Sequence, residues 1–155
     1  MSTKYLLIIE QSDTASTTYI VNKRGQVVSS ATESLKIHSP KPHWREFDSL
    51  ELIYCVRSSV NKALQKKKIQ PKFIESVGIL HQPFTVVLWD PLSGQPVERS
   101  VMANCPRNAF DAGLMAQSQL GEEVSRVSGL PVLPCTGLQK LSWMCSKSVD
   151  IRQSI

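Results

Sequence analysis

An apolar run near the start of the chain, followed by turn formers and two further strand-like segments, most limits what this sequence can fold into. Tyr5 to Ile9 form a short apolar run of the kind that a buried strand needs. Polar turn formers occupy Gln11 to Ser16, and the β-branched and aromatic segment Thr17 to Val21 predicts a second strand. A turn at Lys23 to Gly25 then leads into Gln26 to Ser30. The pattern predicts three antiparallel strands at the beginning of a domain.

A long helix is predicted after a loop. Two prolines in Ser39 to Phe47 are incompatible with regular strand pairing, so this segment is expected to be a loop. Asp48 can accept a hydrogen bond from the first helical turn, with Glu51 as its capping-box partner, and the helix should run to about Lys67. The helix is expected to face a sheet with Ile53, Val56, Val60, Ala63 and Leu64.

The remainder of the chain predicts more strands first and helices afterwards. Strand candidates are Ser76 to Leu80 and Phe84 to Trp89, and a turn is expected at Asp90 to Gly94. Helical signals cover Ala109 to Gln117, Glu122 to Val127 and Leu138 to Cys145. The expected fold class is α/β, with a mixed sheet of about five strands and flanking helices. We expect one domain over residues 1–145 and a polar tail over 146–155, which fits an early stop of the chain.

Composition and cysteine spacing restrict the class of protein. With 155 residues, 41% hydrophobic and 20% charged, the chain has the composition of an ordinary globular domain. The sequence contains no membrane-spanning apolar run and no recognisable leader, so a cytoplasmic protein that does not insert into membranes is expected. The cysteines have neither metal-ligand nor disulfide-framework spacing and are expected to be reduced and mostly buried: Cys55, Cys105, Cys135 and Cys145.

The net charge of +5 raises the question of nucleic-acid binding. Lys66 to Lys68 is the only basic run, and cations at the end of a helix are stabilised by the helix dipole. In many proteins that bind single-stranded nucleic acid, aromatic residues alternate with basic ones. The other basic residues of this chain are not interspersed with aromatic residues in this way. Nucleic acid is therefore not expected as a partner, and a small basic nucleic-acid binder is the last of three functional alternatives.

Four segments in the same order resemble motifs of glycerol kinases. Lys41 to Asp48 is similar to K-P-G-W-V-E-H-D, and Val77 to Asp90 is similar to I-G-I-T-N-Q-R-E-T-T-V-V-W-D. Ser128 to Pro134 resembles T-G-L-P-L-x-P, and Leu141 and Trp143 fit the following K-x-x-W. The resemblance covers nearly the whole chain. It implies the amino-terminal part of a ribonuclease-H-like, or actin-like ATPase, domain of the carbohydrate-kinase superfamily.

The resemblance also implies a phosphate loop after the first strand, D-Q-G-T-T in the family, where the aspartate is associated with magnesium. The matching residues here are Glu10, Gln11, Ser12, Asp13 and Thr14. Ser12 replaces the glycine and is expected to strain the turn or to push a phosphate away. Asp13 adds a carboxylate that would cost on the order of 3 kcal/mol beside each phosphate charge. Glu10 is either a metal ligand or a charge at the end of a strand.

The residues that hold glycerol in the family are changed as well. Next to Gln82, the arginine and glutamate of N-Q-R-E are replaced by Pro83 and Phe84, whose side chains form no hydrogen bonds. The family's tryptophan and tyrosine are replaced by Ala103 and Cys135. The family's catalytic base lies beyond residue 155. The sequence therefore assigns no catalytic residue and no metal ligand set in this chain.

Two functions follow from the resemblance. The first is a degenerate, truncated glycerol-kinase-like protein without phosphotransferase activity of its own, which serves as a binding or regulatory module or is a relic. The alternative is half of an ATP-dependent polyol or carbohydrate kinase, completed by another chain or present in a longer product. No cofactor is expected for the first, and Mg-ATP for the second. A protein partner or self-association is expected at the apolar face left by the missing lobe.

Overall fold

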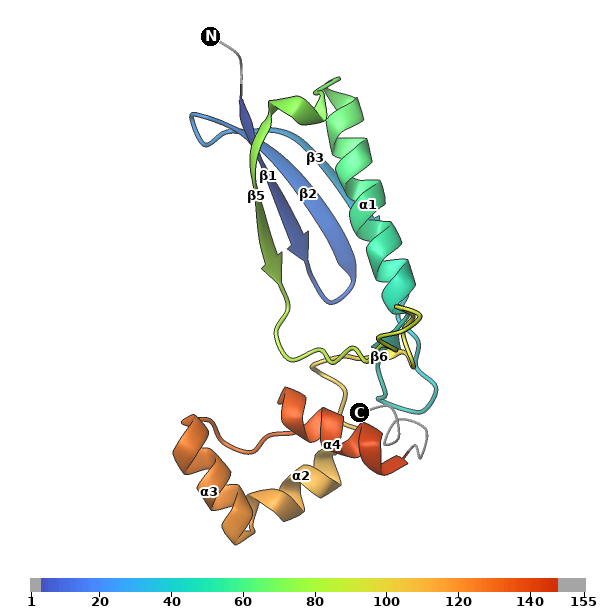
Figure 1. Ribbon diagram of the computed structural model, residues 1–155, viewed down its shortest axis with the longest axis vertical. Coiled ribbons are helices and arrows are strands. Elements are labelled where there is room, and N and C mark those ends of the chain that lie inside the picture. Colours follow the sequence, from blue (N-terminus) through green and yellow to red (C-terminus); the bar gives the residue numbers. More distant parts are fainter. Residues whose placement is uncertain (1–3, 148–155) are drawn as a thin grey trace. The chain divides into compact units, whose positions relative to one another are not determined.

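The computed structural model describes residues 4–147, which form two compact units (Figure 1). The first unit comprises residues 4–36 and 48–82, and the second comprises 37–47 and 83–147. Most of the predicted tail, residues 148–155, lies outside the described residues, whereas Ser146 and Lys147 belong to helix α4 (Gly137–Lys147). The boundary at residue 145 stays a prediction.

A four-stranded mixed sheet forms the first unit. Strands β1 (Tyr5–Gln11), β2 (Ala15–Asn22) and β3 (Val27–Ser34) pair antiparallel, as predicted. A short 3-10 turn at Pro71–Phe73 leads into β5 (Ile74–His81), which pairs parallel with β1. The strand order is β3-β2-β1-β5, so β5 is an edge strand.

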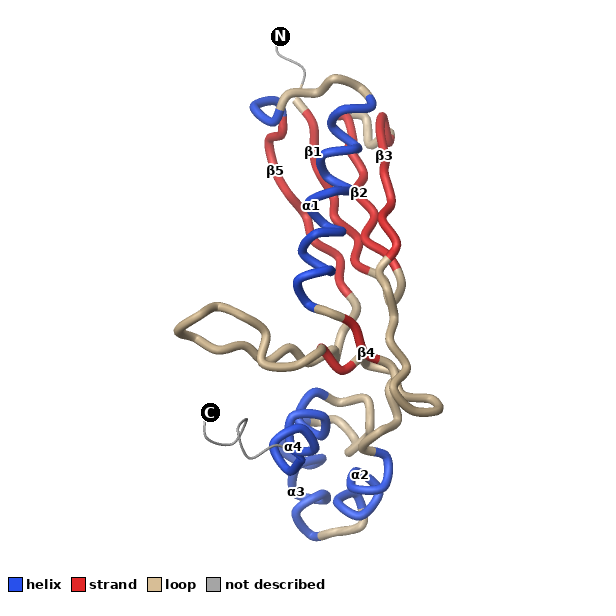
Figure 2. The backbone as a smooth tube through the Cα atoms, turned by 90° about the vertical axis from the view of Figure 1, so that its right-hand side faces the viewer, coloured by secondary structure: helices blue, strands red, loops and turns tan. Residues whose placement is uncertain are grey.

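Helix α1 (Ser49–Lys66) lies along one face of this sheet (Figures 1 and 2). Asp48 caps it, because an Asp48 carboxylate oxygen accepts from the amide of Leu50 at 2.8 Å. The predicted capping box is wrong. The Glu51 carboxylate accepts instead from the amide of Lys36, at 3.1 Å, and so links the helix to the chain that precedes it.

Small side chains let α1 pack closely on the sheet. The helix buries Ser49, Cys55, Ser59 and Ala63. The hydroxyls of Thr18 on β2 and Ser59 lie 2.8 Å apart, and the Ser29 hydroxyl on β3 donates to the carbonyl of Ala63 at 2.6 Å. Of the apolar face expected from the sequence, Ala63 is fully buried, but Ile53 is 46% exposed and that part of the prediction is wrong. The buried hydroxyls are satisfied across the helix–sheet contact.

The predicted strand over residues 84–89 is absent, so the sheet has four strands rather than about five. Pro83 has no amide hydrogen to donate, and Phe84 has a positive φ of 64°, which turns the chain away from a strand path. The segment then makes only isolated bridges, Val86 with Val101 and Trp89 with Pro96. The turn predicted at Asp90 to Gly94 is present, with the Gly94 amide donating to the Asp90 carbonyl at 2.8 Å.

The second unit combines short strands with three helices. Strand β4 (Glu46–Phe47) pairs antiparallel with β6 (Ser100–Val101), so the predicted loop at residues 39–47 is wrong at its last two residues. Helices α2 (Ala109–Ala116), α3 (Gln119–Ser128) and α4 follow and lie together in Figure 2. All three were predicted, with boundaries that differ by at most three residues.

An arginine enclosed by two tryptophans holds this unit together. The guanidinium of Arg107 lies 4.3 Å from the ring centre of Trp44 and 5.4 Å from that of Trp143. It also forms an ion pair with Glu46 at 2.8 Å, and its side chain is only 5% exposed. Trp44 also packs against the core of this unit. Trp89, by contrast, is 55% exposed and takes no part in this core.

Candidate functional site

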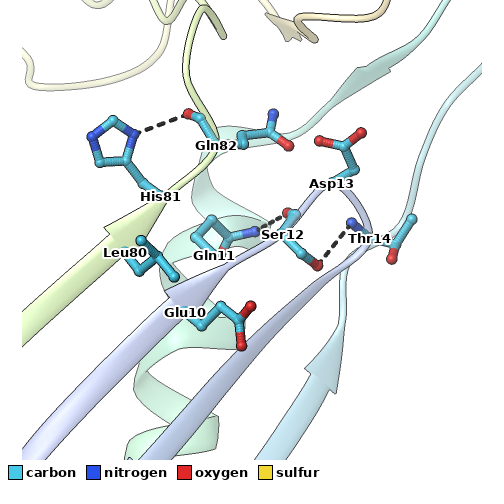
Figure 3. Close-up of a pocket in the computed structure, with 8 residues that line it drawn as sticks. All are labelled: Glu10, Gln11, Ser12, Asp13, Thr14, Leu80, His81 and Gln82. Atoms are coloured by element: carbon cyan, nitrogen blue, oxygen red, sulfur yellow. Dashed lines mark hydrogen bonds between the residues drawn. The ribbon is translucent and has the colours of Figure 1, made fainter.

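The Glu10–Thr14 loop connects β1 to β2 and lines an open hollow of about 420 Å³ (Figure 3). The other lining residues are Leu80, His81 and Gln82, which come from the end of the parallel strand β5. The amide of Gln82 donates to the carbonyl of Gln11 at 3.1 Å and so closes this end of the sheet. The structure therefore brings together the five loop residues singled out from the sequence and the first of the expected substrate positions.

Ser12 uses its side chain to close its own turn. Its hydroxyl oxygen accepts from the amides of Thr14 and Ala15, at 3.4 and 3.2 Å, and donates to the Ala15 carbonyl at 3.1 Å. The Ser12 amide donates to the same carbonyl at 3.0 Å. Three of the loop amides that could bind an anion, those of Ser12, Thr14 and Ala15, are thus paired within the loop.

This arrangement corrects one expectation from the sequence. Replacing glycine by serine was expected to strain the turn or to displace a phosphate. Among residues 4–147, the non-glycine residues with positive φ are His43, Lys68 and Phe84, so Ser12 adopts an ordinary backbone conformation. The turn is not strained, and the serine hydroxyl takes part in its hydrogen bonds.

The side chains of Gln11 and Glu10 are also engaged. Gln11 donates from Nε2 to the carbonyl of Ser12 at 2.8 Å and accepts from the hydroxyl of Ser16. The Tyr19 hydroxyl donates to the Glu10 carboxylate at 2.9 Å. This bond raises the pKa of Tyr19, because it favours the protonated hydroxyl beside a negative group. Glu10 is thus a hydrogen-bonded residue at the end of a strand.

Sequence reasoning missed Tyr19, although the pattern contained the signal. Glu10 pairs with Thr17 across β1 and β2, and side chains two positions apart on a strand share a face. Tyr19 therefore had to lie diagonally opposite Glu10, within reach of a long side chain.

The hollow is acidic. Its lining includes the carboxylates of Glu10 and Asp13 but no lysine or arginine. His81 bonds through Nδ1 to the carbonyl of Gln82 at 2.9 Å. No group of three or more His, Cys, Asp or Glu side chains in residues 4–147 could hold a metal ion. A phosphate in this hollow would lie beside two carboxylates and would meet no lysine or arginine of the lining.

The remaining expected substrate positions belong to the second unit. The buried ammonium of Lys140 donates to the carbonyl of Ala103 at 3.0 Å and to that of Pro134 at 2.8 Å. It therefore brings Ala103 close to the backbone that precedes Cys135. Burial lowers the pKa of Lys140 from its ordinary value, because the charged form loses hydration. Phe84 lies elsewhere, in the lining of a smaller hollow beside α3 and α4.

Comparison with known proteins then decides the family. Residues 5–155 match the N-terminal domain of the FGGY family of carbohydrate kinases. The chain belongs to this FGGY family. A glycerol kinase from Bdellovibrio bacteriovorus is 31% identical over 140 residues, which cover 90% of this chain and 28% of the relative. The FGGY chain thus spans less than a third of the length of that curated relative.

Solved structures agree on the fold. A gluconate kinase from Lactobacillus acidophilus has a TM-score of 0.88 at 17% identity, covering 99% of this chain and 30% of its own. A Plasmodium falciparum glycerol kinase with ADP has a TM-score of 0.86 at 20% identity, covering 97% of this chain and 30% of its own. The predicted ribonuclease-H-like, actin-like fold is confirmed, and the FGGY chain holds part of it. In the described part of the chain, no helix is long and apolar enough to cross a membrane.

Proposed function

We propose that this FGGY chain is a glycerol-kinase-like module that does not transfer phosphate by itself and acts by binding or regulation. The pairing of the Thr14 and Ala15 amides with the Ser12 hydroxyl is the observation that carries this proposal. A phosphate would have to displace that hydroxyl before it could reach the amides. Nucleotide binding in this fold depends on such backbone donors, since phosphoryl transfer is mostly positioning and electrostatic stabilisation.

The charges around the loop add to this argument. The Glu10 and Asp13 carboxylates line the hollow, and no cationic side chain from a lysine or arginine accompanies them. A carboxylate about 4 to 5 Å from a phosphate charge costs on the order of 3 kcal/mol at an effective dielectric constant of 20. Nucleotide phosphates would meet repulsion where an active kinase needs attraction.

The expected polyol positions lead to the same conclusion. Pro83, Phe84 and Ala103 have no side-chain hydrogen-bonding group, and a thiol such as that of Cys135 is a weak one. A compound with several hydroxyl groups needs a partner for each of them once water is excluded. The proposal therefore does not include glycerol as a substrate.

Half of an ATP-dependent kinase, completed by another chain or a longer product, is the second candidate function. The position of the Glu10–Thr14 loop between β1 and β2, beside the end of β5, favours it, as does the limited length shared with the relatives. In this case Mg-ATP would bind once the remaining part of the kinase is supplied.

Calorimetric titration with Mg-ATP tests both functions. We expect no saturable heat with the folded 155-residue chain, nor with Ser93→Gly, a control that makes the same substitution in another turn. Ser12→Gly should expose the Thr14 and Ala15 amides and give weak, measurable binding. Micromolar affinity of the unmodified chain would contradict the first function and support the second. So would affinity that appears on adding the rest of the Bdellovibrio bacteriovorus glycerol kinase.

A protein partner, or a second copy of this chain, is part of the proposal. Seven of the eight residues of edge strand β5 are exposed, including Val77, Ile79 and Leu80 at 59%, 69% and 61%. Exposed apolar edge strands favour pairing with another chain. Sedimentation should detect an assembly that Ile79→Lys weakens and Lys72→Glu leaves unchanged. A chain that stays monomeric at high concentration would exclude self-association, and the partner would then be a different protein.

A cytoplasmic location completes the proposal. The cysteines of the described residues form no disulfide, with Cys55 and Cys105 buried and Cys135 and Cys145 half-buried. Reduced thiols are typical of that compartment.

A further inference from the structure

A second hollow, of about 210 Å³, lies entirely within the second unit, and Phe84 is the only residue of its lining that the proposed function concerns. Helices α3 and α4 and the chain between them line it, together with Phe84. Its apolar side chains are Phe84, Val124, Leu130, Pro131, Val132 and Leu138. Small-molecule sites have this form, with apolar walls and a few polar groups that fix orientation.

Two hydroxyl groups in the lining are already engaged by the backbone. Ser128 donates to the carbonyl of Val124 at 2.6 Å and accepts from the amide of Leu130 at 3.2 Å. Thr136 donates to the carbonyl of Leu133 at 2.9 Å. These hydroxyls shape the ends of α3 and α4, and their hydrogens are committed to protein carbonyls.

Gln139 is different, because its side chain is nearly buried and only half satisfied. The residue is 6% exposed, and Nε2 donates to the sulfur of Met115 at 3.0 Å. A thioether sulfur can only accept, so this contact fixes the orientation of the amide and leaves Oε1 for another donor.

Oε1 accepts no hydrogen bond from residues 4–147. It is also absent from the fully enclosed unpaired side-chain atoms of this part of the chain, so water can reach it. A ligand hydroxyl that replaces this water keeps the oxygen paired, whereas a ligand without a donor leaves it unpaired, which is costly.

Phe84 provides a second, independent indication. Its φ of 64° is uncommon for a bulky side chain, and its ring lines the hollow. Backbone strain of this kind is concentrated at ligand and active sites.

We propose that this hollow binds a small, mainly apolar compound with a single hydroxyl group, which donates to Oε1 of Gln139. A cavity of about 150 Å³ holds benzene, so the space here suits one ring with a short substituent. A polyol does not fit this chemistry, because only one of its hydroxyl groups would find a partner. The inference stands apart from the nucleotide loop and does not require kinase activity.

Titration of the full ¹⁵N-labelled chain with benzyl alcohol, toluene and glycerol, followed by NMR, tests the proposal. Benzyl alcohol should shift the amide signals of Phe84, Gly137 and Gln139 in a saturable way. Toluene has a similar ring without the hydroxyl and should bind about fivefold more weakly, the value of one net hydrogen bond. Glycerol should cause no such shifts.

The variant Gln139→Leu should bind benzyl alcohol and toluene equally, whereas Gln119→Leu, at an exposed position of α3, should keep the preference. The comparison of ligands on the unmodified chain remains decisive even where a variant does not fold. Absence of saturable shifts, shifts confined to residues outside the hollow, or a preference that persists in folded Gln139→Leu would each overturn the proposal. None of these outcomes bears on Mg-ATP binding, which is measured at the other unit.

Discussion

The two units of this chain are stabilised in different ways. The first has long, regular strands, and its buried polar groups are neutral hydroxyls such as Thr18 and Ser59. The second has two-residue strands and encloses the cationic side chains of Arg107 and Lys140. A buried cation is tolerated only when its hydrogens are bonded, and removing its partners is costly. Regular pairing spreads stability over many residues, whereas the second unit depends on a few.

Of the substitutions that test this difference between the units, Lys140→Met should have the largest effect on stability. We expect the free energy of unfolding of the second unit to fall by about 3 kcal/mol, because the carbonyls of Ala103 and Pro134 lose their charged donor. Urea unfolding followed by tryptophan fluorescence measures this, since all three tryptophans belong to the second unit.

Lys147→Met, on the exposed end of the same helix, is the matched control and should change the free energy by less than about 0.5 kcal/mol. Equal effects of the two substitutions would mean that burial of Lys140 does not matter for stability.

A somewhat smaller effect is expected for Arg107→Lys. Lysine keeps the charge but cannot stack as a flat group between Trp44 and Trp143 while it bonds Glu46, so we expect a loss of about 2 kcal/mol. The same fluorescence measurement applies. Arg126→Lys makes the same substitution at an exposed pair with Glu123 and should cost less than about 0.5 kcal/mol. An unchanged free energy of unfolding in Arg107→Lys would contradict the view that the second unit depends on this side chain.

The first unit should respond less to a single buried change. Ser59 already donates to the carbonyl of Val56 at 2.9 Å, so Thr18 provides the hydrogen between the two hydroxyls. Thr18→Val should therefore cost about 1 kcal/mol. Hydrogen exchange of the Ile20 amide on β2 measures it, with Thr17→Val as the control on the opposite face. A loss as large as that of Lys140→Met would remove the distinction between the units.

The smallest effect is a dependence on pH within the first unit. The hydrogen bond and ion pair with Lys62 lower the pKa of Glu33. The stabilisation is therefore complete above the ordinary pKa of a glutamate and is lost as the pH falls through the lowered value. Glu33→Gln should flatten the acid side of the stability curve, measured by circular dichroism in urea. An unchanged acid side would show that the pair contributes nothing.

The sequence predicted the regular first unit better than the second. Alternation and turn chemistry located β1 to β3, and the polar side chain of Asp48 located the start of α1. The run at residues 84–89 has strand-like composition, but Pro83 and the conformation of Phe84 redirect it, and no periodicity contains that information. Likewise, a lysine in a helical pattern is normally placed on the surface, so the burial of Lys140 could not be foreseen.

The same limit applies to the candidate site. The position of the Glu10–Thr14 loop followed from the order of strand and turn signals, which is a property of the chain. The way the Ser12 hydroxyl pairs with the loop amides depends on a side-chain torsion that composition does not determine. The unpaired oxygen of Gln139 depends on contacts between two helices and was equally out of reach.

The parallel pairing of β1 with β5 also has a consequence for folding kinetics. The turns that join β1, β2 and β3 are short, so these hairpins can form within microseconds. Closing β5 onto β1 brings residue 74 to residue 5 and must await a much larger loop closure. We therefore expect β5 to be the last strand of this sheet to dock. Because β5 is also one of the two edge strands, productive folding and misassembly would compete at the same element.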